Sequence, residues 1–203
     1  MSAARTLVAL AALLALLAAG GADGQPRPVV PGARVYLVPV GQLPEQWVGD
    51  LVGYYRTKLK LVLQPLPPLP LDRGALDYAR QQVVAEEVIA LMKRRLPKQV
   101  ADPGAVVIGL TTYDMYIRGV PSWEWAFAFR ADGHFAVVSS ARMDPANWGE
   151  RGDALRLRTR LRKMLSKNLG IMVYDLPQSR DRRSVLYGPI LSLADLDSIG
   201  EDF

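Results

Sequence analysis

The segment from Ala105 to Thr111, which reads Ala-Val-Val-Ile-Gly-Leu-Thr, is almost continuously apolar. A strand with one face in water alternates apolar and polar residues, whereas a continuously apolar strand is covered on both faces. Such strands lie at the centre of sheets that carry helices on two sides. This segment therefore predicts a layered α/β fold in which residues 105–111 form a central, buried strand.

The other expected elements alternate in type along the chain. Apolar and β-branched runs predict strands at 35–40 and 61–64, and Pro39 places the first near a strand end or a sheet edge. Apolar residues recur at helical spacing in three segments, at 45–60, 75–96 and 154–169. Two further apolar runs, 125–129 and 135–139, flank a turn signal and predict a β-hairpin. Together these elements indicate an α/β fold in which a mixed sheet packs with helices.

The N-terminus has the features of a secretory signal peptide. One basic residue, Arg5, precedes an apolar run at 7–19, and small residues follow it. The run is shorter than the roughly 20 residues that a transmembrane helix needs, and no later segment suits a membrane span. We therefore predict a signal peptide at 1–24, cleaved after Ala22 or Gly24, with an uncleaved anchor as the alternative. The prolines at 25–34 then predict a disordered lead-in.

The rest of the chain, 35–203, is expected to form a single domain. Its length lies within the usual range of one domain, and 50% of all residues are apolar. The chain has no cysteine, so it forms no disulfides and its stability must come from packing. These features fit a secreted or periplasmic protein. The net charge of +5 is explained by ordinary solubility.

The segment from Lys163 to Val173 reads Lys-Met-Leu-Ser-Lys-Asn-Leu-Gly-Ile-Met-Val. It resembles the active helix of a metzincin zinc peptidase, His-Glu-x-x-His-x-x-Gly-x-x-His, in which histidines bind zinc and the glutamate is the general base. If Gly170 is the glycine of that pattern, Lys163, Lys167 and Val173 replace the histidines. Met164 then replaces the glutamate. The segment matches this helix without its catalytic residues.

Three other blocks resemble the archaemetzincins, a family of zinc-dependent peptidases. The first is Ala-Arg-Gln-Gln at 79–82, within the expected second helix. The second is Gly-x-Thr-x-x-Asp-x-Tyr at 109–116, which begins at the end of the central strand. The third is the hairpin at 127–142, which ends in Val-Ser-x-x-Arg. The resemblance covers roughly 35–197. It implies a metzincin/archaemetzincin-like fold.

The resemblance also implies what the chain has lost. A member of the family would carry the three histidines, together with cysteines that hold a second, structural zinc. Here the only histidine is His134, in the hairpin turn, and Ser184 and Leu186 occupy the slots of a cysteine and a methionine after the helix. Both zinc sites are therefore lost, and we expect no metal and no other cofactor.

Lysines do not replace the histidine ligands. At neutral pH each lysine would lose its proton at a cost of about 4–5 kcal/mol, given a reference pKa of about 10.4. If the lysines stay protonated, a divalent cation about 5 Å from one ammonium is repelled by about 6–7 kcal/mol at an effective dielectric constant of about 20. We therefore expect an inactive metallopeptidase homologue and not an enzyme.

The leading hypothesis is that the retained cleft binds a peptide or a partner protein in the cell envelope. The binding candidates are Tyr113, Asp114, Trp123, Trp125 and Lys167. The tryptophans have a second interpretation, since they would serve equally well as caps over the core. Nucleic acid is not expected, because no aromatic residues are interleaved with the basic ones for base stacking.

Two alternatives stay open. The first is a hydrolase that reuses the cleft with Tyr113, Asp114, Lys167 or Asp181, or with a pair of carboxylates such as Glu124 and Asp114. The second is a basic module in which the arginines at 156–162 bind anionic envelope polymers, against the simpler interpretation of a solvated helix face. The acidic residues at 195–202 lack the spacing of a calcium loop and are interpreted as a solvated tail.

Overall fold

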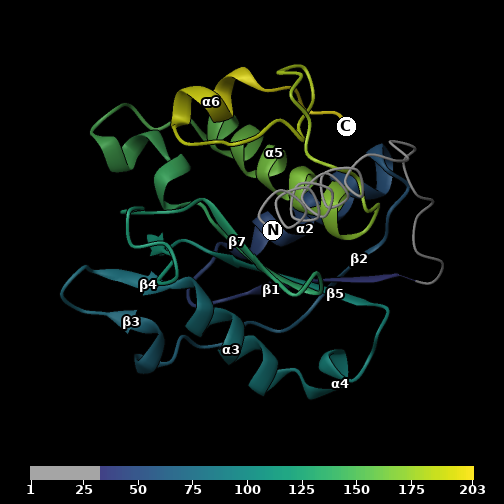
Figure 1. Ribbon diagram of the computed structural model, residues 1–203, viewed down its shortest axis with the longest axis vertical. Coiled ribbons are helices and arrows are strands. Elements are labelled where there is room, and N and C mark those ends of the chain that lie inside the picture. Colours follow the sequence, from purple (N-terminus) through teal and green to yellow (C-terminus); the bar gives the residue numbers. More distant parts are fainter. Residues whose placement is uncertain (1–32) are drawn as a thin grey trace, which may run out of the picture.

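The central feature of the structure is a five-stranded mixed sheet. The computed structural model describes residues 33–203, and the strand order is β2-β1-β5-β8-β7. The strands are β1 (Arg34–Pro39), β2 (Leu63–Pro65), β5 (Ala105–Thr111), β7 (Ala128–Ala131) and β8 (Phe135–Ser139). Neighbours pair in parallel except β7, which runs antiparallel to β8 at one edge (Figure 1). The predicted central strand is confirmed, because β5 lies in the middle of the sheet and every one of its residues is buried.

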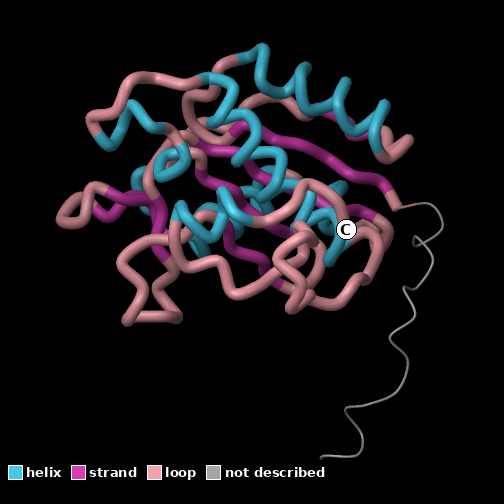
Figure 2. The backbone as a smooth tube through the Cα atoms, turned by 90° about the horizontal axis from the view of Figure 1, so that it is seen from above, coloured by secondary structure: helices cyan, strands magenta, loops and turns pink. Residues whose placement is uncertain are grey.

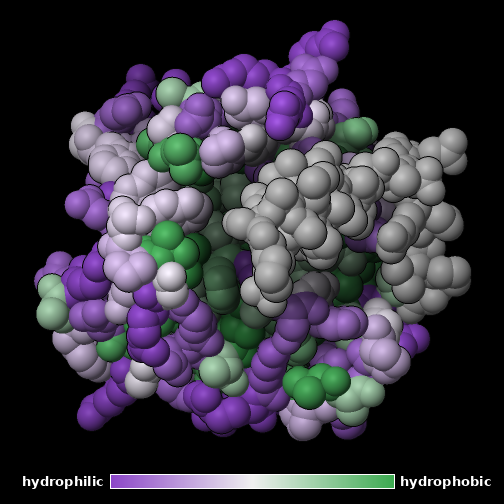
Figure 3. All heavy atoms as spheres, in the orientation of Figure 1, coloured by the Kyte–Doolittle hydropathy of each residue, from purple (hydrophilic) through white to green (hydrophobic). Residues whose placement is uncertain are grey.

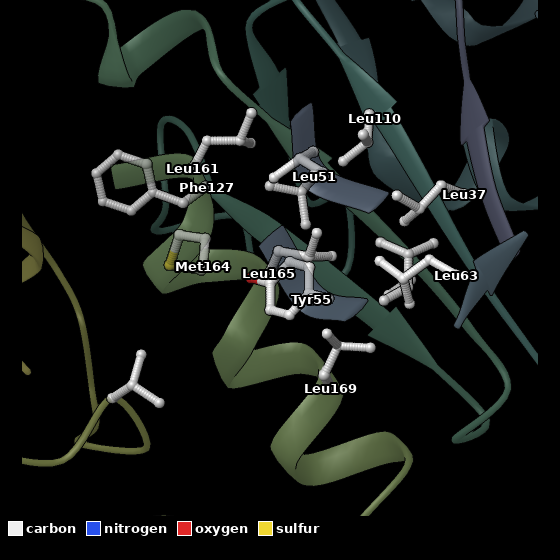
Figure 4. Close-up of a cluster of buried hydrophobic side chains, with 14 of the residues drawn as sticks. Leu37, Leu51, Tyr55, Leu63, Leu110, Phe127, Leu161, Met164, Leu165 and Leu169 are labelled. Carbon is white, nitrogen blue, oxygen red and sulfur yellow. The ribbon is translucent and has the colours of Figure 1, made fainter. Parts of the chain in front are cut away.

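Helices cover both faces of this sheet, as Figure 1 and Figure 2 show. On one face lie α2 (Glu45–Lys58) and α5 (Ala154–Met172), and on the other lie α3 (Ala85–Arg95) and the short α4 (Pro97–Val100). The side chains of β5 alternate accordingly: Ile108 packs in the cluster with α2 and α5, whereas Val107 packs with α3. Figure 4 shows leucines of α5 lying against side chains of α2 and the strands. The predicted α/β class, a mixed sheet packed with helices, is confirmed.

The long helix α5 forms where the sequence predicts it. The carboxylate of Asp153 accepts a hydrogen bond from the backbone N–H of Arg156 at 2.9 Å and so caps the first turn. The helix continues to Met172, three residues past the expected end at 169. Its buried apolar face carries a leucine at each turn, namely Leu157, Leu161, Leu165 and Leu169.

The predicted helix at 75–96 is wrong in its first half. Here the chain forms a hairpin of β3 (Leu76–Asp77) and β4 (Gln82–Val84), and β4 pairs in parallel with β6 (Met115–Tyr116). The carboxylate of Asp77 accepts hydrogen bonds from the backbone N–H groups of Ala79 and Arg80, each at 3.1 Å, and this local bonding stabilises a turn at the expense of a helix. The Ala-Arg-Gln-Gln sequence therefore lies in a turn and a strand.

Smaller differences concern the ends of elements. Pro39 ends β1, which is an interior strand, and β7 begins at Ala128 rather than at 125. Arg34, expected at the end of a disordered lead-in, already pairs with Ala105. The expected signal peptide and the lead-in at 25–32 lie outside the described residues. Within 33–203 no helix is long and apolar enough to cross a membrane.

After α5 the chain folds back over that helix. The short helix α6 (Leu193–Ser198) packs against α5, and Arg160 donates two hydrogen bonds to the carboxylate of Asp197, at 2.7 and 2.6 Å. Three short 3-10 helices complete the described elements, at Arg73–Ala75, Ala141–Met143 and Pro145–Trp148. One side of α5 is thus covered by the sheet and another by the C-terminal segment.

Candidate functional site

Two lysines of α5 lie where the resemblance places zinc ligands, and both are buried. Lys163 is 7% exposed and Lys167 is 4% exposed. The Nζ of Lys163 donates hydrogen bonds to the backbone oxygens of Leu196 and Asp197, at 3.2 and 2.9 Å. The Nζ of Lys167 donates to the backbone oxygen of Tyr187. Both ammonium groups therefore donate to carbonyl groups of the segment after α5.

Burial lowers the pKa of both lysines because it disfavours the charged form. For Lys167, burial together with repulsion by Arg130 lowers the pKa to about 8. For Lys163, burial lowers the pKa while the nearby carboxylates of Asp197 and Glu201 act in the opposite direction. A group with a pKa near 8 is still mostly protonated at neutral pH. Lys167 is thus a positive charge held in a largely dehydrated position.

The remaining positions of the degenerate pattern belong to the core. Met164 and Val173 are buried in the cluster between α5 and the sheet. Gly170 faces the turn at 184–186, and a Cβ at this position would lie 2.7 Å from the Cδ2 of Leu186. In that turn the hydroxyl of Ser184 accepts a hydrogen bond from the backbone N–H of Leu186 at 3.1 Å. These residues hold α5 against its surroundings.

A groove with a volume of about 540 Å³ opens beside α5. Its walls are residues 122–128 and Arg130, the side chains of Met164 and Lys167 on α5, and Gln178 with residues 189–191. Three of the five binding candidates line it, namely Trp123, Trp125 and Lys167. The molecular surface is hollowed on the face that carries α5, α6 and β7, and apolar side chains lie in the hollow (Figure 3). The groove offers aromatic and apolar contacts with one buried cation.

Behind the groove, the three blocks that carry the resemblance meet in one polar network. Asp114 accepts two hydrogen bonds from the guanidinium of Arg142, at 2.9 and 2.5 Å, and one from the side-chain amide of Gln82 at 2.9 Å. Gln82 and Arg80 also donate to the backbone oxygen of Glu124, at 3.0 and 2.7 Å. Because Glu124 belongs to the groove wall, this network fixes the wall relative to the sheet.

The structure brings Glu124 into the groove lining but leaves Tyr113, Asp114 and Asp181 outside it. Asp114 is engaged by Arg142, and Tyr113, which is 37% exposed, lies outside the groove lining. Asp181 pairs with Arg183 at 2.8 Å. Of the five side chains considered for a hydrolase, Lys167 and Glu124 line the groove, whereas Tyr113, Asp114 and Asp181 do not, so the expected carboxylate pair of Glu124 and Asp114 does not share this pocket.

The charged segments of the sequence form ion pairs with their surroundings. Arg160 and Arg162 of α5 lie 2.6 and 3.7 Å from the acidic residues Asp197 and Glu201. The neighbouring arginines Arg156 and Arg158 lie 3.4 and 3.5 Å from Glu150 and Asp50. His134 stays in the hairpin turn, where its Nδ1 lies 3.1 Å from the backbone oxygen of Ala105. Much of the basic face of α5 is thus neutralised locally.

Sequence reasoning missed Arg130, a half-buried residue of β7 that lines the groove. Its Nη1 donates a hydrogen bond to the side-chain oxygen of Asn168 at 3.0 Å, and burial lowers the pKa of the guanidinium. Asn168 is fully buried and donates in turn to the backbone oxygen of Met164 at 2.7 Å. The sequence signal was a single arginine inside an otherwise apolar hairpin.

The side chains at the positions where the resemblance places metal ligands do not suit zinc. The two ammonium groups already donate to carbonyl oxygens and offer no lone pair while protonated. Val173 has no ligand atom, and Met164 cannot act as a general base. In the part of the chain that the structure describes, no three His, Cys, Asp or Glu residues are grouped so as to hold a metal ion.

The architecture defines a fold class: a mixed sheet with an antiparallel edge strand and a groove beside that strand packs against a long helix, and residues 163–173 of this helix resemble the metzincin pattern. Comparison with solved structures then specifies the fold as that of the archaemetzincins. No protein-family model and no curated protein matches the chain.

Three solved structures support this assignment. Archaemetzincin from Archaeoglobus fulgidus, complexed with malonate, is 19% identical, with a TM-score of 0.66 over 84% of this chain and 94% of that one. Archaemetzincin from Methanopyrus kandleri is 24% identical, with a TM-score of 0.64 over 86% and 92%. A zinc-dependent peptidase from Methanocorpusculum labreanum is 19% identical, with a TM-score of 0.70 over 83% and 95%. At these identities the likeness establishes the fold.

Proposed function

We propose that the protein is an exported, non-catalytic homologue of archaemetzincin peptidases that binds a peptide or a partner protein in the groove beside α5. One observation carries the proposal. The groove is open and lined by Trp123 and Trp125, while the lysines at the former metal positions are tied to carbonyl oxygens. Contacts for a ligand are retained where the groups for hydrolysis are replaced.

The position of β7 supports an extended peptide as the ligand. This strand forms one edge of the main sheet, and the segment that leads into it lines the groove. An edge strand can pair with the backbone of an added strand, while neighbouring pockets accept alternate side chains. A peptide lying along β7 would place its side chains against the groove tryptophans.

The N-terminal sequence supports a location in the cell envelope. A basic residue, an apolar run and small residues precede residue 25, as in a secretory signal peptide. A reporter enzyme that is active only after export, fused behind residues 1–34, tests this part of the proposal. Activity is expected with the natural segment and should be lost when an aspartate pair interrupts the apolar run; activity that survives this change argues against export by a signal peptide.

Zinc content tests the loss of catalysis. The purified protein is equilibrated with zinc, freed of excess metal and measured by atomic spectrometry, and its cleavage of unstructured peptides is followed with and without a chelator. We expect zinc far below one ion per chain and no chelator-sensitive cleavage. Near-stoichiometric zinc together with cleavage that the chelator abolishes would falsify the non-catalytic assignment.

Ligand binding is tested separately by tryptophan fluorescence. The chain has four tryptophans, and replacing Trp47 and Trp148 by phenylalanine leaves only the two that line the groove. We expect the emission of this variant to change in a saturable manner when groove-binding peptides are added. A matched variant that keeps Trp47 and Trp148 but replaces Trp123 and Trp125 by phenylalanine should show no such change.

A further inference from the structure

Two cations line the same groove. Arg130 reaches the groove from β7 and Lys167 reaches it from α5. Each donates a hydrogen bond to a neutral oxygen: Arg130 to the side-chain amide of Asn168, and Lys167 to the backbone carbonyl of Tyr187. The proximity of Arg130 contributes to the lowered pKa of Lys167. Like charges held together in a dehydrated site repel, so this arrangement is unfavourable unless an anion joins it.

Other buried or half-buried arginines in the described chain have such an anion. Arg142 is paired with Asp114, and Arg160 is paired with Asp197. Within residues 33–203, no carboxylate contributes to the pKa of Arg130 or of Lys167: burial alone lowers the first, and burial with the neighbouring guanidinium lowers the second. Arg130 and Lys167 therefore differ from Arg142 and Arg160, each of which forms an ion pair with a carboxylate.

The pair is also fixed in place. Asn168 accepts the hydrogen bond from Arg130 and donates one to the backbone oxygen of Met164, so its amide orientation is set by the helix itself. At Gly188, a Cβ would lie 3.1 Å from the Nζ of Lys167, so the backbone after Tyr187 closes tightly on the ammonium. A rigid pair of donors that opens to a groove is suited to binding a ligand group without rearrangement.

We propose that Arg130 and Lys167 form an anion-binding site in the groove, and that the bound peptide presents a carboxylate to them. This inference rests on the proposed peptide-binding function and specifies its ligand. The planar guanidinium matches a carboxylate with two parallel hydrogen bonds, and the lysine adds a point charge. The groove walls beside them, Trp125 and Phe127 among them, suit apolar residues that flank the acidic group.

The other charged groups around the site agree with this placement. Lys163 lies one turn earlier on the same helix, outside the groove lining, and the carboxylates of Asp197 and Glu201 act on it. Glu124 lines the groove on the wall segment, so it disfavours an anion at its own position and favours one at the cationic pair. The segment 189–191 contributes no charged side chain. The carboxylate is therefore placed between Arg130 and Lys167.

The test uses four mixtures of hexapeptides whose flanking positions are randomised over Ala, Leu, Tyr and Ser. The central residue is Glu or Gln, and the C-terminus is free or amidated, so that side-chain and terminal carboxylates are distinguished. Binding of each mixture to the full chain is measured by the groove-tryptophan fluorescence and by isothermal titration. Lys167→Met and Lys167→Gln remove the charge, and Lys98→Met, an exposed lysine on α4, is the matched control.

We expect at least one of the carboxylate mixtures to bind about tenfold or more tightly than the neutral, amidated Gln mixture, as for a charge-assisted contact. Both Lys167 variants should lose this preference, and Lys98→Met should keep it. In the unaltered protein the preference should also fall as pH rises past about 8, where Lys167 loses its proton. This pH profile tests the site even if the variants fold poorly.

Two other results overturn the inference in distinguishable ways. Equal binding of all four mixtures, unchanged by Lys167→Gln and by pH, leaves a peptide groove but refutes the anion site. No binding of any mixture at millimolar concentration refutes the anion site and the peptide-binding function together.

Discussion

The buried ammonium of Lys167 makes the stability of the protein depend on pH in a specific way. Its folded pKa is about 8, against an ordinary value of 10.5. Below pH 8 the lysine is charged in both the folded and the unfolded chain, and the folded state carries the full cost of burying that charge. As pH rises from 8 to 10.5 the folded state binds fewer protons than the unfolded state, so the free energy of unfolding increases.

The magnitude follows from the two pKa values. At about 1.4 kcal/mol per pH unit, the difference corresponds to about 3 kcal/mol as an upper limit. Water that enters the groove screens the ammonium, so we expect about 2 kcal/mol. Lys167→Met removes the charge and keeps much of the side-chain volume. The variant should therefore gain stability relative to the unaltered protein at pH 7, and this advantage should shrink by about 2 kcal/mol at pH 10.

Urea denaturation of the two proteins at pH 7 and pH 10 measures this difference. The comparison of proteins at each pH cancels the titration of groups common to both, such as Tyr55, whose pKa is raised by burial. The lost hydrogen bond to the Tyr187 carbonyl costs about 1 kcal/mol and does not depend on pH in this range. A stability difference that stays constant between the two pH values would refute the assignment of a buried, strained charge to Lys167.

Two further substitutions test the packing of α5 and the wall of the groove. Gly170→Ala places a methyl group 2.7 Å from a methyl of Leu186, so it should destabilise the protein by about 1 kcal/mol even after the gain in helix propensity. Gly49→Ala on α2 is the control: the added methyl meets no atom within 4 Å, so thermal unfolding should show a stabilisation of about 0.5–1 kcal/mol. If both alanines stabilise the protein equally, the close contact is not real. Asp114→Asn breaks a half-buried bidentate ion pair and should cost about 2 kcal/mol in urea denaturation. Asp50→Asn, at an exposed pair 3.5 Å long, should change stability by less than about 0.5 kcal/mol, and similar costs for the two would argue against a structural network behind the groove.

The sequence predicted an element correctly where the pattern that defines it lies within the element itself. The strand β5 was predicted because burial on both faces leaves a continuous apolar run that any seven residues can display on their own. The predicted helix at 75–96 was wrong in its first half. Residues 82–84 form the strand β4 because Asp77 stabilises the preceding turn and because β4 pairs with β6, about 30 residues away in the sequence. Helical periodicity cannot reveal a strand partner at that distance.

The candidate site was predicted in the same uneven way. Trp123, Trp125 and Lys167 were named in advance and line the groove, since two are large aromatics and one sits in a recognisable pattern. The resemblance blocks suggested a fold but gave no sign that Gln82, Asp114 and an arginine would converge behind the groove wall. Arg130 was missed because its burial, and the lack of a carboxylate beside it in the described chain, are tertiary properties.

The central claim is that this fold retains a peptide groove without peptidase chemistry. The most direct measurement is to incubate the zinc-equilibrated protein overnight with the carboxylate-bearing hexapeptide mixtures. Bound and free peptides are then separated by gel filtration, and the peptide masses in both fractions are measured by mass spectrometry. We predict intact peptides in the bound fraction and no fragments in either. Fragments that disappear when a chelator is present, or a protein fraction that carries no peptide, would contradict the claim.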